Sequence, residues 1–324
     1  MSLRKLIKSK FGYDVSDLSA YVDEQREELL TRQVSEARTL SLINIQTGIK
    51  HSEALKLMDD TITYQAGDCS MTPSGDTVFS DRVITVETLG FMKEFCNKDL
   101  AGFWTQLSLR PGASAEDKEL PFQAQLLNYI LSLHAKELDS LIWKGNKSLP
   151  SGNLSFMDGF IKLLTTANGC VDLNQTAIST LTSSNAYNVF FGAYQEMQAS
   201  NATLAEDETA GFFCGVETLT KLRRNMIDLN FFTFTPDANN YSQPLFGTTK
   251  MVEAVNGLNG TNKIYFGKRS EMVFGTDLES DFDNIELWYS QDDDKLKLRS
   301  KFRAGVQVPF LDQIGVFDVV TSES

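Results

Sequence analysis

The chain has few of the side chains that metal sites and redox centres require. Its 324 residues include 2 histidines and 4 cysteines. Cys69, Cys96, Cys170 and Cys214 form no CxxC pair, which argues against a zinc knuckle, an iron–sulfur cluster and a dithiol redox motif. We therefore expect free thiols. His134 falls within a predicted helix and is interpreted as a packing or surface residue.

Segments that would direct the chain to or through a membrane are also lacking. No run of 18 apolar residues occurs. The segment Met1–Lys10 is basic and has no apolar stretch like that of a signal peptide. We expect a protein that is made in the cytoplasm and does not cross a membrane.

The motifs of common enzyme classes are missing. There is no GxSxG, HExxH or GxGxxG, and Gly267–Lys268, the nearest approach to a phosphate-binding loop, is followed by Arg269 instead of serine or threonine. The carboxylates of 277–283 and 292–294 could bind a hard cation, but Phe282 stands where a calcium loop needs glycine. We expect no enzyme activity and no catalytic, cofactor-binding or metal-binding residues.

Positive charge is scarce relative to negative charge. The chain has 30 lysines and arginines against 43 acidic residues, a net charge of −13. This balance argues against a protein whose main task is to bind nucleic acid. Hydrophobic residues at 42% and charged residues at 23% are typical of a folded soluble protein, and the length allows about two domains. The basic residues concentrate in Arg4–Lys10 and Lys295–Arg303.

The first 90 residues predict an arm and a hairpin. Ser16 and Asp17 can cap a helix that runs to about Leu42, and its thin apolar stripe fits an arm lying on another surface or a short coiled segment. Residues 61–88 contain extended segments around a turn at Pro73–Gly75. Few bulky apolar residues lie near its tip, so we expect this hairpin to project.

The strongest helix signal covers residues 121–144. Pro121 suits the first helical position, and Gly145 suits a left-handed stop. A wide apolar face and a length of about 36 Å make this helix a central support. The rest of the chain alternates helices and strands, which predicts an α+β fold: helices over 156–164 and 185–197, a buried strand over 211–216 followed by a helix, and alternating apolar residues from Ile285 to Phe310.

Basic side chains occupy every second position of one predicted strand. A strand directs alternate side chains to one face, so five positive charges share one side. Two interpretations stay open: a solvated face that pairs with the acidic stretch 277–286 across a hairpin, or a contact with an acidic partner, either another subunit or nucleic acid. The five residues are Lys295, Lys297, Arg299, Lys301 and Arg303.

Several stretches follow one another in a recognisable order between residues 40 and 315. They are 76–86 leading into 91–100, 126–145 with 158–161, 211–225, and 245–249 through 274–277 to 302–309. Taken in this order, they resemble the major capsid protein of tailed double-stranded DNA bacteriophages. Encapsulin nanocompartments and the herpesvirus capsid floor share that fold.

The resemblance implies a division of the chain. The expected parts of the chain are an N-terminal arm (1–60), an E-loop hairpin (61–88), a peripheral domain (89–155) with its spine helix (121–144), an axial domain (156–283) and a closing β segment (284–324).

The resemblance also implies a function. The protein is expected to be a structural one that self-assembles as hexamers and pentamers into the icosahedral virion capsid. Its expected partners are a portal and, optionally, scaffolding or decoration proteins. The shell encloses double-stranded DNA without sequence-specific binding, and the protein is made in the host bacterial cytoplasm. The alternatives are an encapsulin-type shell, a soluble enzyme with a site built from scattered carboxylates, and a phage tail or adhesion protein.

Two features of some relatives are not expected here. Those relatives join a hairpin lysine to an asparagine of a neighbouring subunit, but here Lys56 and Lys93 bracket the predicted hairpin, and no asparagine follows Asn284. We therefore expect no isopeptide crosslink. The residues before the hairpin are too few for an attached scaffolding domain, so any scaffolding should be a separate protein.

Overall fold

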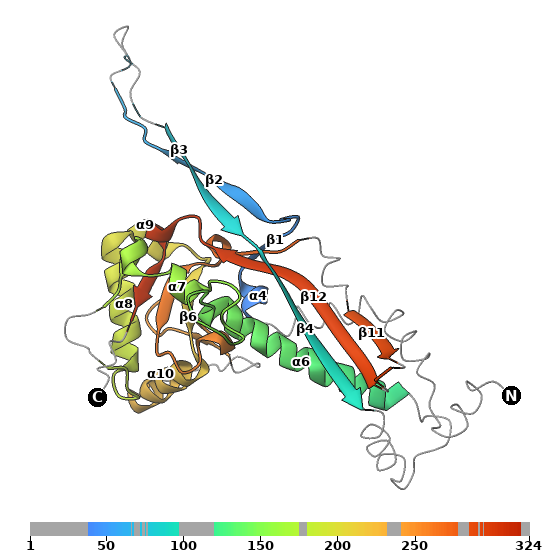
Figure 1. Ribbon diagram of the computed structural model, residues 1–324. Coiled ribbons are helices and arrows are strands. Elements are labelled where there is room, and N and C mark those ends of the chain that lie inside the picture. The colour runs from blue at the N-terminus through green and yellow to red at the C-terminus, as the bar shows by residue number, and fades with distance from the viewer. Residues whose placement is uncertain are drawn as a thin grey trace, which may run out of the picture.

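A computed structural model describes most of the chain (Figure 1). The described residues are 38–65, 67, 72, 75, 77–96, 120–174, 180–231, 241–277, 285–290, 292–293 and 295–318. The predicted N-terminal helix lies outside them except at its end, where α4 (Arg38–Leu42) is found. A compact body, a long sheet lying along one helix, and a projecting hairpin make up the molecule.

The compact body is built on a six-stranded mixed sheet with strand order β5-β13-β9-β6-β8-β7. Every residue of its central strand β6 is buried, and helices α8, α9 and α10 supply much of the cover. The bounds are β5 Val171–Asp172, β6 Ala210–Cys214, β7 Ser242–Pro244, β8 Met251–Ala254, β9 Ile264–Lys268, β13 Gly315–Phe317, α8 Ala186–Ser200, α9 Ala202–Glu206 and α10 Val216–Asp228.

The long helix is confirmed as α6 (Leu120–Lys144). Gly145 follows it as predicted, but its backbone does not have the positive φ of a left-handed stop. Glycine is needed there for space, because a Cβ would lie 2.5 Å from the Met157 carbonyl oxygen. The predicted helix 156–164 is reduced to α7 (Phe160–Leu163). The short 3-10 turns are η1 Thr166–Asn168, η2 Asn256–Leu258, η3 Arg269–Glu271 and η5 Leu311–Gln313.

The second sheet is organised around one long strand, β12 (Lys295–Gln307). Strand β4 (Glu87–Cys96) pairs with it over ten residues, from Cys96 opposite Lys295 to Glu87 opposite Ala304. The predicted alternation in β12 is confirmed, since Leu298, Phe302 and Ala304 are buried. On the other edge lie β11 Ile285–Ser290, β10 Val273–Gly275 and β1 Asn44–Gln46.

The hairpin consists of β2 (Ser52–Asp60) and β3 (Thr77–Thr85), paired antiparallel over nine positions. The prediction of its first strand was wrong: residues 61–65 form no strand, and β2 lies in the range assigned to the arm. Because β2 is mostly exposed, its sequence carries no burial period, and only pairing with β3 defines it. Lys56 therefore lies on the hairpin, whereas the sequence placed it outside.

A buried carboxylate fixes α4 against the long helix. Asp139 of α6 is 1% exposed, and its two oxygens accept hydrogen bonds from the Thr39 N–H at 3.1 Å and the Gly257 N–H at 2.7 Å. Trp143 donates its ring N–H to the Thr39 hydroxyl at 2.8 Å. A five-residue helix has little stability by itself, so these contacts hold it in place.

Candidate assembly surfaces

One face of the hairpin carries exposed apolar residues in opposed pairs. Met58 of β2 lies directly opposite Phe79 of β3, and Ala54 lies opposite Val83. Met58 is 62% exposed, Phe79 74% and Val83 51%. Between the two apolar pairs, exposed Lys56 and Asp81 oppose each other. We call these six residues the apolar hairpin face: Ala54, Lys56, Met58, Phe79, Asp81 and Val83.

The base of the hairpin, by contrast, is anchored. Ile84 is fully buried in a small cluster with Ile49, Val86 and Val273. Two side-chain hydrogen bonds also tie β3 to the end of β12 and the residue after it: Arg82 donates to the Val308 carbonyl at 3.1 Å, and Gln307 donates to the Val83 carbonyl at 2.8 Å. The hairpin is thus held in one direction, away from the body (Figure 1).

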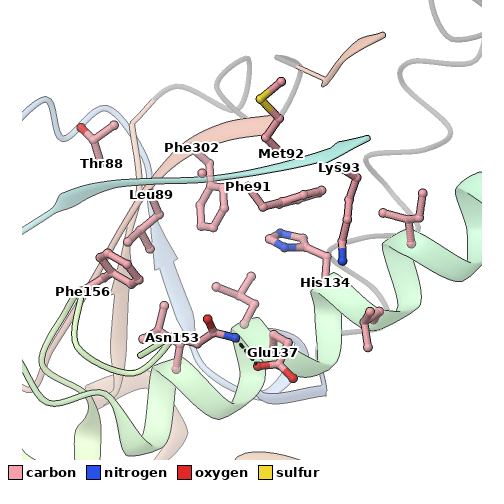
Figure 2. A pocket seen from close by; sticks show the side chains of 15 residues that line it. Thr88, Leu89, Phe91, Met92, Lys93, His134, Glu137, Asn153, Phe156 and Phe302 are labelled. Carbon is pink, nitrogen blue, oxygen red and sulfur yellow. Dashed lines mark hydrogen bonds between the residues drawn. The ribbon is translucent and has the colours of Figure 1, made fainter. Parts of the chain in front are cut away.

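A pocket of about 450 Å³ lies between β4 and α6 (Figure 2). Its lining is mostly apolar and combines β4, α6, Phe302 of β12 and the loop after α6. Two exposed apolar side chains line it, Leu133 and Phe156, the latter at 56% exposure. Such a volume lies within the range of pockets that bind ligands or side-chain anchors.

His134 forms part of this pocket, and its ring is close to two aromatic rings. The centroid of Phe91 lies at 4.9 Å and that of Phe302 at 5.1 Å. The buried Nε2 has no hydrogen-bond partner among the described residues. Burial lowers the pKa of His134 from 6.5 to about 4, so the imidazole is neutral at pH 7. The prediction that His134 lies in the long helix is confirmed. No feature of the sequence indicated that this residue lines a pocket.

Charged groups of both signs also line this pocket. Lys93 of β4 and Glu137 of α6 are exposed, and Asn153 donates a hydrogen bond to Glu137 at 3.3 Å. Figure 2 shows all three side chains around the apolar lining. The pocket thus offers an apolar floor with one positive and one negative group.

The basic stripe of β12 is largely neutralised within the chain. Lys295 pairs with Glu94 at 2.8 Å. The other pairs are Lys297 with Asp293, Arg299 with Glu286, and Arg303 with Asp277. The predicted pairing with the acidic stretch 277–286 is confirmed for Arg299 and Arg303, whereas Lys295 and Lys297 pair with acids outside that stretch. Glu94 of β4 and the turn residue Asp293 were not among the predicted partners.

Lys301 is the exception on this face. It is exposed, and the part of the chain that the structure describes supplies no ion-pair partner for it. Its neighbour across the ladder on β4 is Gly90, which has no side chain. Surface pairs of this kind contribute little to stability, so the stripe chiefly balances charge across the sheet.

The other candidate residues of the sequence do not assemble into a site. Lys268 lies in β9 and pairs with Asp207 at 2.8 Å, so Gly267–Lys268 is not a phosphate-binding loop. In the described ranges, no three His, Cys, Asp or Glu side chains are grouped so as to hold a metal. None of the described helices is long and apolar enough to cross a membrane.

The three described cysteines have free thiols. Cys96 is exposed, and Cys170 and Cys214 are buried. Burial raises the pKa of the Cys170 thiol to about 11 and raises that of Cys214 further. The two buried thiols are therefore unreactive at neutral pH. Cys69 lies outside the described residues.

Comparison with known proteins identifies the fold. No protein-family model and no curated protein matches the sequence. The chain is similar to solved structures of three phage capsids. A chain of the satellite phage P4 procapsid has a TM-score of 0.57 and 11% identity, with 90% of each chain covered. A capsid chain of cyanophage A-1(L) has a TM-score of 0.58 and 11% identity, covering 90% of this chain and 93% of the other.

The third similar structure is the capsid of Myoviridae phage XM1, with a TM-score of 0.51 and 13% identity over 86% of this chain and 89% of the other. Together with the long helix, the long sheet and the projecting hairpin, these likenesses define the class of fold. The chain has the α+β fold of tailed-phage major capsid proteins. The predicted fold class is confirmed.

Proposed function

We propose that this protein is a major capsid protein that self-assembles into the icosahedral shell of a tailed bacteriophage. The shell would be built from hexamers and pentamers and would enclose packaged double-stranded DNA. Its site of action would be the virion capsid, after synthesis in the host bacterial cytoplasm. The fold shared with phage capsid chains supports this proposal.

The observation that carries the proposal is the exposed apolar hairpin face. A two-stranded hairpin has little stability by itself in water, and here two apolar cross-strand pairs lie uncovered at a distance from the body. Large apolar side chains that stay exposed on one face are candidates for an interaction site. A shell of identical subunits would cover that face on every copy at once, because closed symmetry repeats the same contact.

We assign the proposed parts of a capsid subunit to the elements of this fold. The arm would extend to about residue 50 and the E-loop hairpin would cover 52–85. The peripheral domain would contain β4, α6 and β12, and the axial domain the six-stranded sheet. Portal, scaffolding and decoration proteins are proposed partners. The internal pairing of the β12 stripe supports a container that holds DNA without binding its sequence.

Expression of the full chain, followed by size-exclusion chromatography and negative-stain electron microscopy, tests the proposal. Closed particles of uniform size are expected. A monomer or small oligomer, both alone and during production of the complete phage, would refute the shell function. Deletion of residues 70–76, which connect β2 to β3 in the sequence, should impair particle formation; unimpaired assembly would remove this segment from the assembly mechanism.

A further inference from the structure

Residues 38–49 contact three parts of the molecule in succession: the compact body, the long helix α6 and the base of the hairpin. They comprise α4, β1 and the residues after β1, and Figure 1 shows α4 beside α6 and β1 near the hairpin base. We propose that this segment, the coupling strap, links an ion-paired cluster of the compact body to the hairpin base, so that loosening one end loosens the other. The proposal concerns the single chain and does not depend on the shell function.

The first end of the coupling strap is held by a buried carboxylate of the compact body. Glu253 of β8 accepts hydrogen bonds from the Arg38 guanidinium at 2.7 Å and from the Arg269 guanidinium at 3.0 Å, and only 7% of its side chain is exposed. Arg38 also donates its Nε–H to the Ala254 carbonyl at 2.9 Å and lies 5.0 Å from the centroid of the Tyr241 ring. Charge-assisted hydrogen bonds of this kind are stronger than neutral ones. Because Arg269 also binds Glu253, replacing Arg38 releases the strap and leaves the carboxylate paired.

The middle of the coupling strap is fastened to the long helix. Leu40 and Ile43 are buried in the core cluster to which α6 contributes. Thr39 bonds to both Asp139 and Trp143 of α6. Since α4 has only five residues, it is helical only while such contacts hold it. It is therefore an element with two states, docked as a helix or released.

The second end of the coupling strap lies in the cluster that anchors the hairpin. Strand β1 has three residues, stands at the end of the strand order of its sheet and pairs with β10. The Gln46 carbonyl accepts a hydrogen bond from the Thr276 N–H at 2.9 Å, and the Ile49 N–H donates to the Thr276 carbonyl at 3.0 Å. Ile49 is 1% exposed and packs in the same cluster as Ile84 of β3. Strand β2 begins three residues after it, at Ser52.

The short distance along the chain makes the strap one unit. Only Ile43 separates the end of α4 from the start of β1, so a released α4 cannot leave β1 undisturbed. A three-residue strand at a sheet end opens at low free-energy cost, because few hydrogen bonds hold it. Energetic coupling between two sites requires an element with two arrangements that both sites bias. In this chain α4 is that element, and the sites are Glu253 and the cluster around Ile49.

Hydrogen–deuterium exchange of the full chain, followed by mass spectrometry, tests the coupling. Arg38→Met removes the bonds to Glu253 and Ala254 and keeps an apolar side chain. We expect exchange in peptides that contain Ile49 and Thr276 to become about tenfold faster, because local opening governs the exchange of these amides. Variant and unmodified chains are compared in the same form, either as subunits or as particles.

Lys263→Met is the matched control. It removes a cation of similar exposure, 24% against 21% for Arg38, from an ion pair of the same body, and it lies outside the strap. Exchange at the hairpin base should change by less than about twofold in this variant, because its exposed pair with Asp318 contributes little to stability.

Two results would overturn the proposal. Faster exchange confined to residues 38–42, with the hairpin base unchanged, would show that the strap transmits nothing. Equal acceleration in Lys263→Met would show a general loosening of the body. If Arg38→Met does not fold, Arg38→Lys gives the same comparison with about threefold faster exchange expected, because lysine keeps the charge and loses the bond to Ala254. Absence of particles from the unmodified chain would instead refute the shell function alone.

The coupling must also act in the opposite direction, because a coupling free energy between two sites is reciprocal. Ile49→Val removes one methylene from the hairpin base and should make exchange in α4 about fivefold faster. Ile264→Val removes the same group from a fully buried position of β9 and is the control, with a change in α4 of less than about twofold expected. Unchanged α4 exchange in Ile49→Val, or equal acceleration in both variants, contradicts the strap.

Discussion

The six-stranded sheet and the hairpin are both β structures, yet they depend on different partners. Each residue of β6 is buried by its own chain, with Phe212 fully enclosed between Phe190 and Phe266. In the hairpin, Phe79 is 74% exposed. The sheet is therefore stabilised within one subunit, whereas the apolar side chains of the hairpin stay exposed in the single chain.

The largest effect should come from the sheet. Phe212→Ala removes a fully buried ring from β6 and should lower the free energy of unfolding by about 3–5 kcal/mol. Chemical denaturation of the soluble subunit measures this loss. A change below about 1 kcal/mol would mean that the sheet core does not dominate subunit stability.

A smaller effect on the free energy of unfolding is expected from His134, and this effect depends on pH. Its pKa is about 4 in the folded chain and 6.5 in the unfolded chain, so between these values the unfolded chain binds more protons. The stability contributed by the neutral imidazole is therefore complete above pH 6.5 and is lost as the pH falls toward 4. The full loss amounts to about 3 kcal/mol.

The titratable neighbours in the pocket are Lys93 of β4 and Glu137 of α6. His134→Leu should flatten the dependence of the unfolding free energy on pH between 4 and 6.5, as measured by urea denaturation at several pH values. An unchanged slope in that variant would assign the acid sensitivity to other groups.

The hairpin should show the opposite behaviour to the sheet. Phe79→Asp should change the unfolding free energy of the isolated subunit by less than about 0.5 kcal/mol, because the ring is exposed. It should lower particle yield by more than about tenfold if the proposed shell covers the hairpin, since a carboxylate would then replace the largest exposed apolar side chain of that face. Val78→Asp, on the other hairpin face, is the control and should assemble better. A clearly lower unfolding free energy of the Phe79→Asp subunit would contradict the comparison, because it would mean that Phe79 stabilises the isolated subunit as the sheet residues do.

The smallest effect is expected on the outer face of the long sheet. Lys295→Ala breaks an exposed pair with Glu94 and should leave the thermal unfolding midpoint unchanged within error. A clearly lower thermal unfolding midpoint would show that the ion pairs of the stripe stabilise the sheet as well as balance its charge.

Much of the fold could be predicted from local patterns. The long helix differs from its prediction by one residue at its start, because Phe122, Leu126 and Ile130 repeat with a helical period. The alternation of β12 was clear, because its inward positions are apolar except for Ser300 and its outward ones are basic from Lys295 to Arg303. Both signals lie within one segment, where periodicity can be read.

The missed elements depend on distant parts of the chain. Strand β4 was not predicted as a strand, although Leu89, Phe91 and Phe95 alternate, and its role became clear only from its pairing with β12. Strand β2 was missed because an exposed strand has no apolar period. The pocket could not be predicted, since its walls come from β4, α6 and β12.

The sequence by itself determined the α+β class, the central helix, the projecting hairpin and the alternation of charge along β12. These features follow from the spacing of side chains along one segment. Only the tertiary structure decided which strand completes the hairpin, which acids neutralise the stripe, and that His134 lies at a pocket between β4 and α6. These depend on contacts between segments far apart in the chain, and no local pattern encodes which segments will meet.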